Sequence, residues 1–146
     1  MCGIAGTAGR ADRDLVTRMI DIISHRGPDD SGVYLSDAVA GPRAVGLGNR
    51  RLSIIDLSPA GRMPMSNHDG TIWLSYNGEV YNHPELRREL EAAGHRFRSR
   101  TDTEVILQLY EAEGLAMLPR LDGMFAFALW DERRGQLVLA RDRLGV

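Results

Sequence analysis

Residues 123–131 constrain the fold more than any other part of this sequence. They contain seven consecutive apolar residues, from Met124 to Trp130, flanked by glycine and charged residues. Side chains alternate between the two faces of a strand, so a strand here is apolar on both faces and must be covered on both. Residues 136–142 follow the turn-like segment 132–135 and predict the second strand of a hairpin.

The rest of the chain combines amphipathic helices with further strands. The helix patterns predict helices over residues 12–24, 84–94 and 101–114, the last opened by a capping box of Thr101 and Glu104. The strand patterns cover residues 2–6, 33–35, 44–55 and 71–76. We expect the strand at 71–76 to stop at the turn pair Asn77-Gly78. Buried strands and amphipathic helices together indicate a layered α+β sandwich.

Composition narrows the functional classes. A chain of 146 residues is the size of one ordinary domain. Its net charge of -2 gives no general attraction to nucleic acid or to anionic lipid. All 18 basic residues are arginine, so the sequence offers no lysine for a Schiff base or a phosphate-binding loop. We therefore expect no nucleic-acid partner and no membrane partner.

The single cysteine, Cys2, directly follows Met1. Removal of Met1 would place its thiol beside a free α-amine, and an N-terminal amine can serve as the base for its own nucleophile. A lone cysteine is also a common small buried hydrophobe, so the dipeptide alone is weak evidence of catalysis. A single thiol and the lack of a basic, apolar leader segment favour a cytoplasmic protein. The four scattered histidines show no zinc spacing, and we predict no metal site.

Six motifs occur in order along the chain. They are Met1-Cys2-Gly3-Ile4, His25-Arg26-Gly27-Pro28-Asp29, Arg51-Leu52-Ser53-Ile54-Ile55-Asp56, Tyr76-Asn77-Gly78-Glu79-Val80-Tyr81-Asn82, Thr101-Asp102-Thr103-Glu104-Val105-Ile106 and Leu121-Asp122-Gly123-Met124-Phe125-Ala126-Phe127. Together they resemble the glutaminase domain of the asparagine synthetase family, a class II glutamine amidotransferase and N-terminal nucleophile hydrolase. The resemblance extends over residues 1–146 and is far more specific than any one motif.

The resemblance implies a four-layer αββα sandwich of two antiparallel sheets. It also implies hydrolysis of the glutamine side-chain amide to glutamate and ammonia through a thioester on Cys2. No cofactor is expected in this domain, because ATP and Mg would act in a separate synthetase domain that receives the ammonia. No segment of the sequence matches the ATP-binding loop of such a domain.

The resemblance assigns roles to individual residues. Cys2 is the nucleophile, and Asn77 with the backbone N–H of Gly78 forms the oxyanion hole. Arg51 would hold the α-carboxylate of glutamine and Asp102 its α-ammonium. Residues with supporting roles are Leu52, Ile54 and Glu79 in the substrate pocket and Arg26 near the nucleophile.

The sequence also allows simpler, structural interpretations of some of these residues. Asn77-Gly78 is also a common hairpin turn. Arg51 can be one more solvated arginine, and Asp102 can serve only to stabilise a helix N-terminus. Asp102 can also do both.

Alternatives at the level of the whole protein remain as well. The ammonia acceptor can be aspartate or another carboxylate. A catalytically silent glutamine-binding or structural module would keep the same fold. A phosphoribosyl or sugar-phosphate amidotransferase shares the Met-Cys-Gly start but fits the segments at Arg26 and Arg51 less well. Family members continue beyond residues 141–146, so we expect a domain truncated at its C-terminal end, with an exposed sheet edge. A homodimer is among the expected assemblies.

Overall fold

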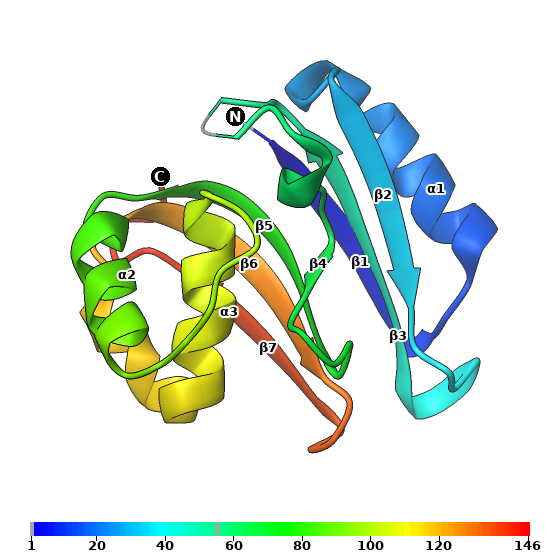
Figure 1. Ribbon diagram of the computed structural model, residues 1–146. Coiled ribbons are helices and arrows are strands. Elements are labelled where there is room, and N and C mark those ends of the chain that lie inside the picture. The colour runs from blue at the N-terminus through cyan, green and yellow to red at the C-terminus, as the bar shows by residue number, and fades with distance from the viewer. Residues whose placement is uncertain (1, 55) are drawn as a thin grey trace.

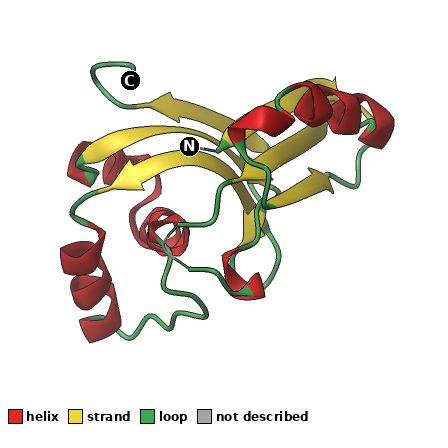
Figure 2. Ribbon diagram, turned by 90° about the horizontal axis from the view of Figure 1, so that it is seen from above, coloured by secondary structure: helices red, strands yellow, loops and turns green. Residues whose placement is uncertain are grey.

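The computed structural model describes residues 2–54 and 56–146, which form four layers (Figure 1). Helix α1 covers the outer face of a three-stranded sheet, which stacks on a four-stranded sheet whose other face is covered by α2 and α3 (Figure 2). Every strand pair is antiparallel. The predicted αββα sandwich is therefore confirmed.

The helix bounds are close to those predicted from sequence, whereas the strands predicted over residues 2–6 and 33–35 are longer and the short strand at residues 65–66 was not predicted. The helices are α1 (Arg13–Ile22), α2 (His83–Ala92) and α3 (Asp102–Glu113). The first sheet has the order β1 (Gly3–Arg10), β3 (Ala40–Arg51), β2 (Asp30–Leu35). The second has the order β4 (Met65–Ser66), β5 (Ile72–Val80), β6 (Gly123–Asp131), β7 (Gln136–Arg141). Short 3₁₀ helices cover Ser24–Arg26, Pro59–Gly61 and Gly114–Arg120.

Strand β3 is the centre of the first sheet, and its two faces differ sharply. Gly46 and Gly48 face α1, where a Cβ built on Gly48 would lie only 2.5 Å from Cγ2 of Ile20. The residues of opposite parity, Leu47 and Asn49 among them, therefore face the second sheet. Small residues on one face thus let the helix approach, and the other face is free to carry larger side chains between the sheets.

Strand β6 is covered on both faces, as its apolar sequence predicts. Phe127 and Leu129 belong to the large core cluster between the second sheet and helices α2 and α3. Trp130, 1% exposed, packs with Val45 and Leu47 between the two sheets. The predicted hairpin of β6 and β7 is also present, with Asp131 paired with Gln136 at its closed end.

The predicted turn at Asn77-Gly78 is wrong. β5 continues through both residues to Val80, with Asn77 opposite Ala126 and Gly78 opposite Phe125 in β6. Pairing along the whole length of β6 outweighs the local turn preference of an Asn-Gly pair. The extended segment predicted over 44–55 is β3 only as far as Arg51, and Ile55 lies outside the described residues.

Helix α3 begins as predicted at Thr101, whose Oγ1 accepts the Glu104 N–H at 3.3 Å. The second half of the capping box differs from the usual pattern. The Glu104 carboxylate binds the preceding loop instead, accepting the backbone N–H groups of Arg98 and Ser99 and the hydroxyl of Ser99. Glu104 is 1% exposed, so it fixes the loop before α3 from inside the protein.

Glu104→Gln should lower the free energy of unfolding by on the order of 2–3 kcal/mol. In the wild type the buried donors of Arg98 and Ser99 share a charged acceptor, whereas in the variant the glutamine NH₂ group would face one or more of them. Urea unfolding of the two proteins measures the difference. Glu85→Gln is the control, since this exposed residue of α2 pairs only with Arg88 and its loss should cost less than about 1 kcal/mol. Equal effects of the two substitutions would contradict the role given to Glu104.

Candidate active site

Cys2 lines a cavity of about 110 Å³ to which both sheets and the start of α3 contribute residues. The cysteine directly precedes β1, and its Sγ accepts the Leu52 N–H at 3.4 Å. Of the nine predicted site residues, seven line this cavity and two, Asn77 and Arg26, do not. The seven are Cys2, Arg51, Leu52, Ile54, Gly78, Glu79 and Asp102.

The chain segment beside Cys2 is held by Asp29, which belongs to the second sequence motif. The Asp29 N–H donates to the carbonyl oxygen of Arg51 at 3.1 Å. Its carboxylate accepts the Ser53 N–H at 2.7 Å. Asp29 therefore fixes the end of β3 and the first residues after it, where Leu52 contacts the thiol.

Asp56 connects the same loop to the start of α3. Its Oδ1 accepts the Ser58 N–H at 2.9 Å, and its Oδ2 accepts the Arg100 N–H at 3.0 Å. Hydrogen bonds from Ser58 and from the Arg100 backbone lower the pKa of Asp56 from 3.8 to about 2. The ionised carboxylate thus joins two loops at the mouth of the cavity.

Arg51 is buried, with 6% of its surface exposed. Its guanidinium donates to the backbone carbonyl oxygens of Asp56 and Ser58. Within the described residues, no carboxylate lies within 4.0 Å of it. A desolvated guanidinium with only neutral partners favours an anion from outside the chain, and the cavity it lines gives such an anion access.

Asp102 is the first residue of α3 and is also buried. Its carboxylate accepts the Tyr76 hydroxyl at 2.5 Å, the Val80 N–H at 3.0 Å and the Thr103 N–H at 2.9 Å. Burial, followed by the charge of Asp102, raises the pKa of Tyr76 far above its usual value, so the hydroxyl stays a donor. These bonds aim a carboxylate into the cavity and confirm that Asp102 occupies a helix N-terminus.

The backbone N–H of Gly78 points away from β6. Backbone N–H groups alternate in direction along a strand, so those of Ile72, Gly78 and Val80 point to the same side of β5. The Ile72 N–H donates to Asn67 and the Val80 N–H donates to Asp102, and neither partner belongs to β6. β4 ends before this point, because it pairs only as far along β5 as Leu74. The Gly78 N–H is therefore uncovered by a neighbouring strand on the side where the cavity lies.

Gly78 must also be a glycine. A Cβ at this position would lie 2.2 Å from the carbonyl oxygen of Met124. Any side chain would push β5 away from β6 and move the N–H that faces the cavity.

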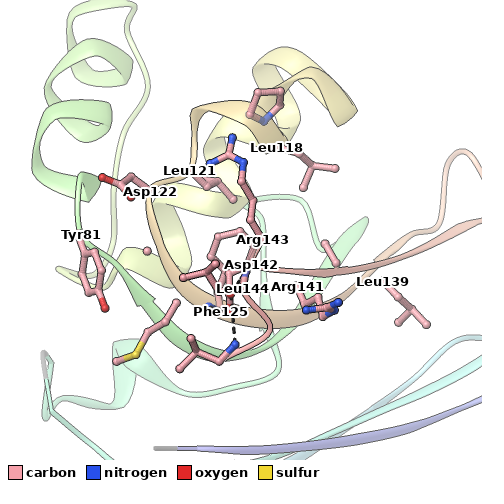
Figure 3. A pocket seen from close by; sticks show the side chains of 15 residues that line it. Tyr81, Leu118, Leu121, Asp122, Phe125, Leu139, Arg141, Asp142, Arg143 and Leu144 are labelled. Atoms are coloured by element: carbon pink, nitrogen blue, oxygen red, sulfur yellow. Dashed lines mark hydrogen bonds between the residues drawn. The ribbon is translucent and has the colours of Figure 1, made fainter.

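Asn77 lines a neighbouring cavity of about 200 Å³ that shares Gly78 and Met124 with the cavity of Cys2. Its Oδ1 is buried and has no hydrogen-bond partner among the described residues. A third cavity of about 880 Å³ adjoins in turn and shares five residues with the second, Met124, Phe125, Arg141, Asp142 and Val146. Figure 3 shows this third cavity, with Tyr81 and Leu144 at its lining.

Arg26 lies elsewhere. It ends the 3₁₀ helix after α1, and its Cβ would be 3.2 Å from a Cβ built on Gly3. Gly3 also contacts Ile23, so Arg26 sits on the α1 side of the first sheet and its side chain is exposed. Its supporting role stays a prediction.

Comparison with known proteins decides the family. The family described as "Glutamine amidotransferase domain" matches residues 1–146, the whole chain. The chain belongs to this glutamine amidotransferase family. The resemblance drawn from the six motifs is thereby confirmed.

Relatives of the amidotransferase domain include synthetases. "Asparagine synthetase [glutamine-hydrolyzing] 3" of Bacillus subtilis is 43% identical over all of this chain and 24% of its own length. "Amidase chry2" of Gibberella zeae is 43% identical over 97% of this chain and 20% of its own. The amidotransferase domain thus spans about a quarter or less of the length of these curated relatives.

A solved structure supports the fold. The glutamine phosphoribosylpyrophosphate amidotransferase of B. subtilis matches 99% of this chain and 38% of its own, with a TM-score of 0.78. Its sequence identity is 20%, so the likeness concerns the fold alone.

Sequence reasoning missed several residues that line the cavity of Cys2. The further lining residues are Asp56, Gly61, Met63, Tyr76, Thr101, Thr103 and Met124. Most of them lie within or beside the six motifs, and the strand alternation of Tyr76 and Gly78 could have placed both on one side of β5. No group of three or more His, Cys, Asp and Glu side chains in the described chain is placed to hold a metal ion. None of the described helices is long and apolar enough to cross a membrane.

The low pKa of Asp56 predicts a pH-dependent contribution to stability. Because the folded-state pKa of about 2 lies below 3.8, ionised Asp56 favours the folded state above about pH 4, and this contribution is lost as the pH falls toward 2. Urea unfolding of the wild type and of Asp56→Asn at several pH values between 5 and 2 measures it. The stability gap between the two proteins should narrow as the pH falls. A constant gap would contradict the pairing of Asp56 with the two loops.

Proposed function

We propose that the domain hydrolyses the side-chain amide of glutamine to glutamate and ammonia through a thioester on Cys2. One observation carries the proposal: a thiol, an oriented carboxylate and a buried guanidinium that has no carboxylate partner among residues 2–54 and 56–146 line one small cavity. The first group suits attack on an amide, and the other two suit the charged α-groups of an amino acid.

The substrate would be held through its α-carbon. Arg51 would bind the α-carboxylate, for which a planar guanidinium offers two parallel donors. Asp102 would accept from the α-ammonium, since its bonds from Tyr76 and Val80 already fix its direction. Leu52, Ile54 and Glu79 would line the path of the side chain toward Cys2.

Catalysis would begin with attack of the Cys2 sulfur on the amide carbon. The thiol proton passes to the α-amine of Cys2, which is free once Met1 is removed; Met1 lies outside the described residues. The negative charge on the former carbonyl oxygen would be stabilised by the Gly78 N–H, with the Asn77 side-chain amide acting from the adjoining cavity that shares Gly78. The amide nitrogen then takes the proton and leaves as ammonia. Water hydrolyses the remaining thioester, which releases glutamate and restores the thiol.

The ammonia would serve a second reaction. The curated relatives named as asparagine synthetases suggest glutamine-dependent asparagine synthesis, with ATP and Mg used by a separate synthetase domain. The neighbouring cavities, which both share Met124 with the cavity of Cys2, support release of the ammonia through them. A cytoplasmic location, which would keep the Cys2 thiol reduced, is part of the same proposal.

Cys2→Ala should lower kcat for glutamine hydrolysis by at least about 10³-fold, because the covalent path is lost. Release of glutamate and ammonia from the processed protein measures the rate. Glutamine binding, followed by calorimetry, should persist in Cys2→Ala and weaken strongly in Arg51→Ala.

The binding measurement also separates the alternative function. A wild-type protein that binds glutamine without hydrolysing it would be the catalytically silent module. Hydrolysis that persists in Cys2→Ala would contradict the thioester mechanism.

A further inference from the structure

The nucleophile and the groups proposed to stabilise the oxyanion lie on different sheets. Cys2 precedes β1 of the first sheet, whereas Asn77 and Gly78 lie in β5 of the second. Their distance therefore depends on how the two sheets are aligned. A shift of one sheet by a fraction of an ångström would separate the attacked carbon from the donors that must meet its oxygen.

Most of the contact between the sheets is apolar and cannot fix this alignment alone. Val45, Leu47 and Trp130 form its core, with Tyr34 and Trp73 packed against them. Burial of apolar surface is favourable but has no direction. A precise alignment requires hydrogen bonds from one sheet to the other.

Asn49 and Ser75 supply such bonds, and both are 0% exposed. The Asn49 Nδ2 donates to the Tyr76 carbonyl oxygen at 3.0 Å and to Ser75 Oγ at 3.4 Å. The Ser75 hydroxyl donates to the Gly48 carbonyl oxygen at 2.8 Å. Both partners of the Asn49 Nδ2 are acceptors, so they fix which end of the side-chain amide faces β5.

The bond to the Tyr76 carbonyl holds β5 directly before the two residues proposed to supply the oxyanion donors. That carbonyl belongs to the peptide unit that ends at Asn77 N, one residue before Gly78. Asn49 also lies two residues before Arg51 on β3, so both side chains project from the same face. One amide thus joins the strand that carries the carboxylate-binding arginine to the peptide unit that directly precedes the proposed oxyanion donors.

Stability does not explain an asparagine at this position. The Oδ1 of Asn49 is buried without a hydrogen-bond partner among the described residues. An unsatisfied buried oxygen destabilises the fold and offsets part of what the Nδ2 hydrogen bonds contribute, so stability alone is a weak reason for an asparagine. The Oδ1 of Asn49 is thus unfavourable for folding, while its Nδ2 binds β5.

We propose that Asn49 is a positioning residue that aligns the oxyanion donors on β5 with Cys2. This inference rests on the proposed glutamine hydrolysis. It assigns Asn49 no contact with glutamine, so its loss should affect the transition state far more than substrate binding.

The test compares Asn49→Leu with Ser75→Ala. Asn49→Leu removes the bond to the Tyr76 carbonyl with little change of volume, whereas Ser75→Ala disturbs the same buried contact but keeps that bond. We expect Asn49→Leu to lower kcat by at least about 10-fold with KM changed by less than about 3-fold. Ser75→Ala removes a bond between the sheets that does not reach the Tyr76 carbonyl, so it should lower kcat by less than about 3-fold.

A second readout follows the oxyanion site without turnover. The γ-aldehyde analogue of glutamine adds the Cys2 thiol to its carbonyl, which places an oxygen where the oxyanion forms. Asn49→Leu should bind this analogue at least about 10-fold more weakly, while its affinity for glutamate and the alkylation rate of Cys2 by iodoacetamide stay within about 3-fold. These two controls show that the variant is folded and that its thiol is intact.

The outcomes separate the two claims. A wild type that neither hydrolyses glutamine nor binds the aldehyde overturns the proposed function, and this inference with it. If the wild type does both, equal losses of glutamate and aldehyde affinity in Asn49→Leu would show a merely structural role. Unchanged kcat in Asn49→Leu, or an equal fall in Ser75→Ala, would also overturn the inference.

Discussion

The face-to-face stacking of two antiparallel sheets is the constraint on which this structure depends. Each sheet also carries helices on its outer face, so the strands at the centre lose contact with water on both sides. Apolar residues fill most of the space between the layers, as Trp130 and Leu47 show. A polar group in this region must find a partner or serve a purpose, because its desolvation is costly.

Three buried polar residues lie around the cavity of Cys2. Arg51, Asn49 and Asp102 are all less than a tenth exposed. Arg51 and Asp102 line the cavity of Cys2, and Asn49 binds the carbonyl of Tyr76, which also lines it. Tyr76 is the link between them, since its carbonyl accepts from Asn49 and its hydroxyl donates to Asp102. The same residue therefore joins the first sheet, the second sheet and α3. Packing and the proposed chemistry depend on the same few hydrogen bonds.

The sequence predicted those parts of the molecule that local pattern determines. The hairpin of β6 and β7 and the start of α3 at Thr101 were placed within about a residue, because alternation, turn residues and capping are local signals. Asn77-Gly78 was placed in a turn because its local preference is for a turn, while its pairing with β6 depends on residues nearly fifty positions away. The motifs contain twelve of the fourteen residues that line the cavity, but roles were predicted for only seven of them. They did not predict that Asp56 binds the Arg100 backbone or that Tyr76 binds Asp102, since such contacts arise only when the layers assemble.

The central claim is that Cys2 becomes an N-terminal nucleophile aimed into a glutamine-binding cavity. Intact mass spectrometry before and after treatment with a diazo-ketone analogue of glutamine tests it most directly, with Cys2→Ala as the control. The account predicts a mass without Met1, followed by a single adduct that maps to Cys2 and is suppressed by excess glutamine. A folded, processed protein whose Cys2 stays unlabelled, or a protein labelled equally in Cys2→Ala, would contradict it.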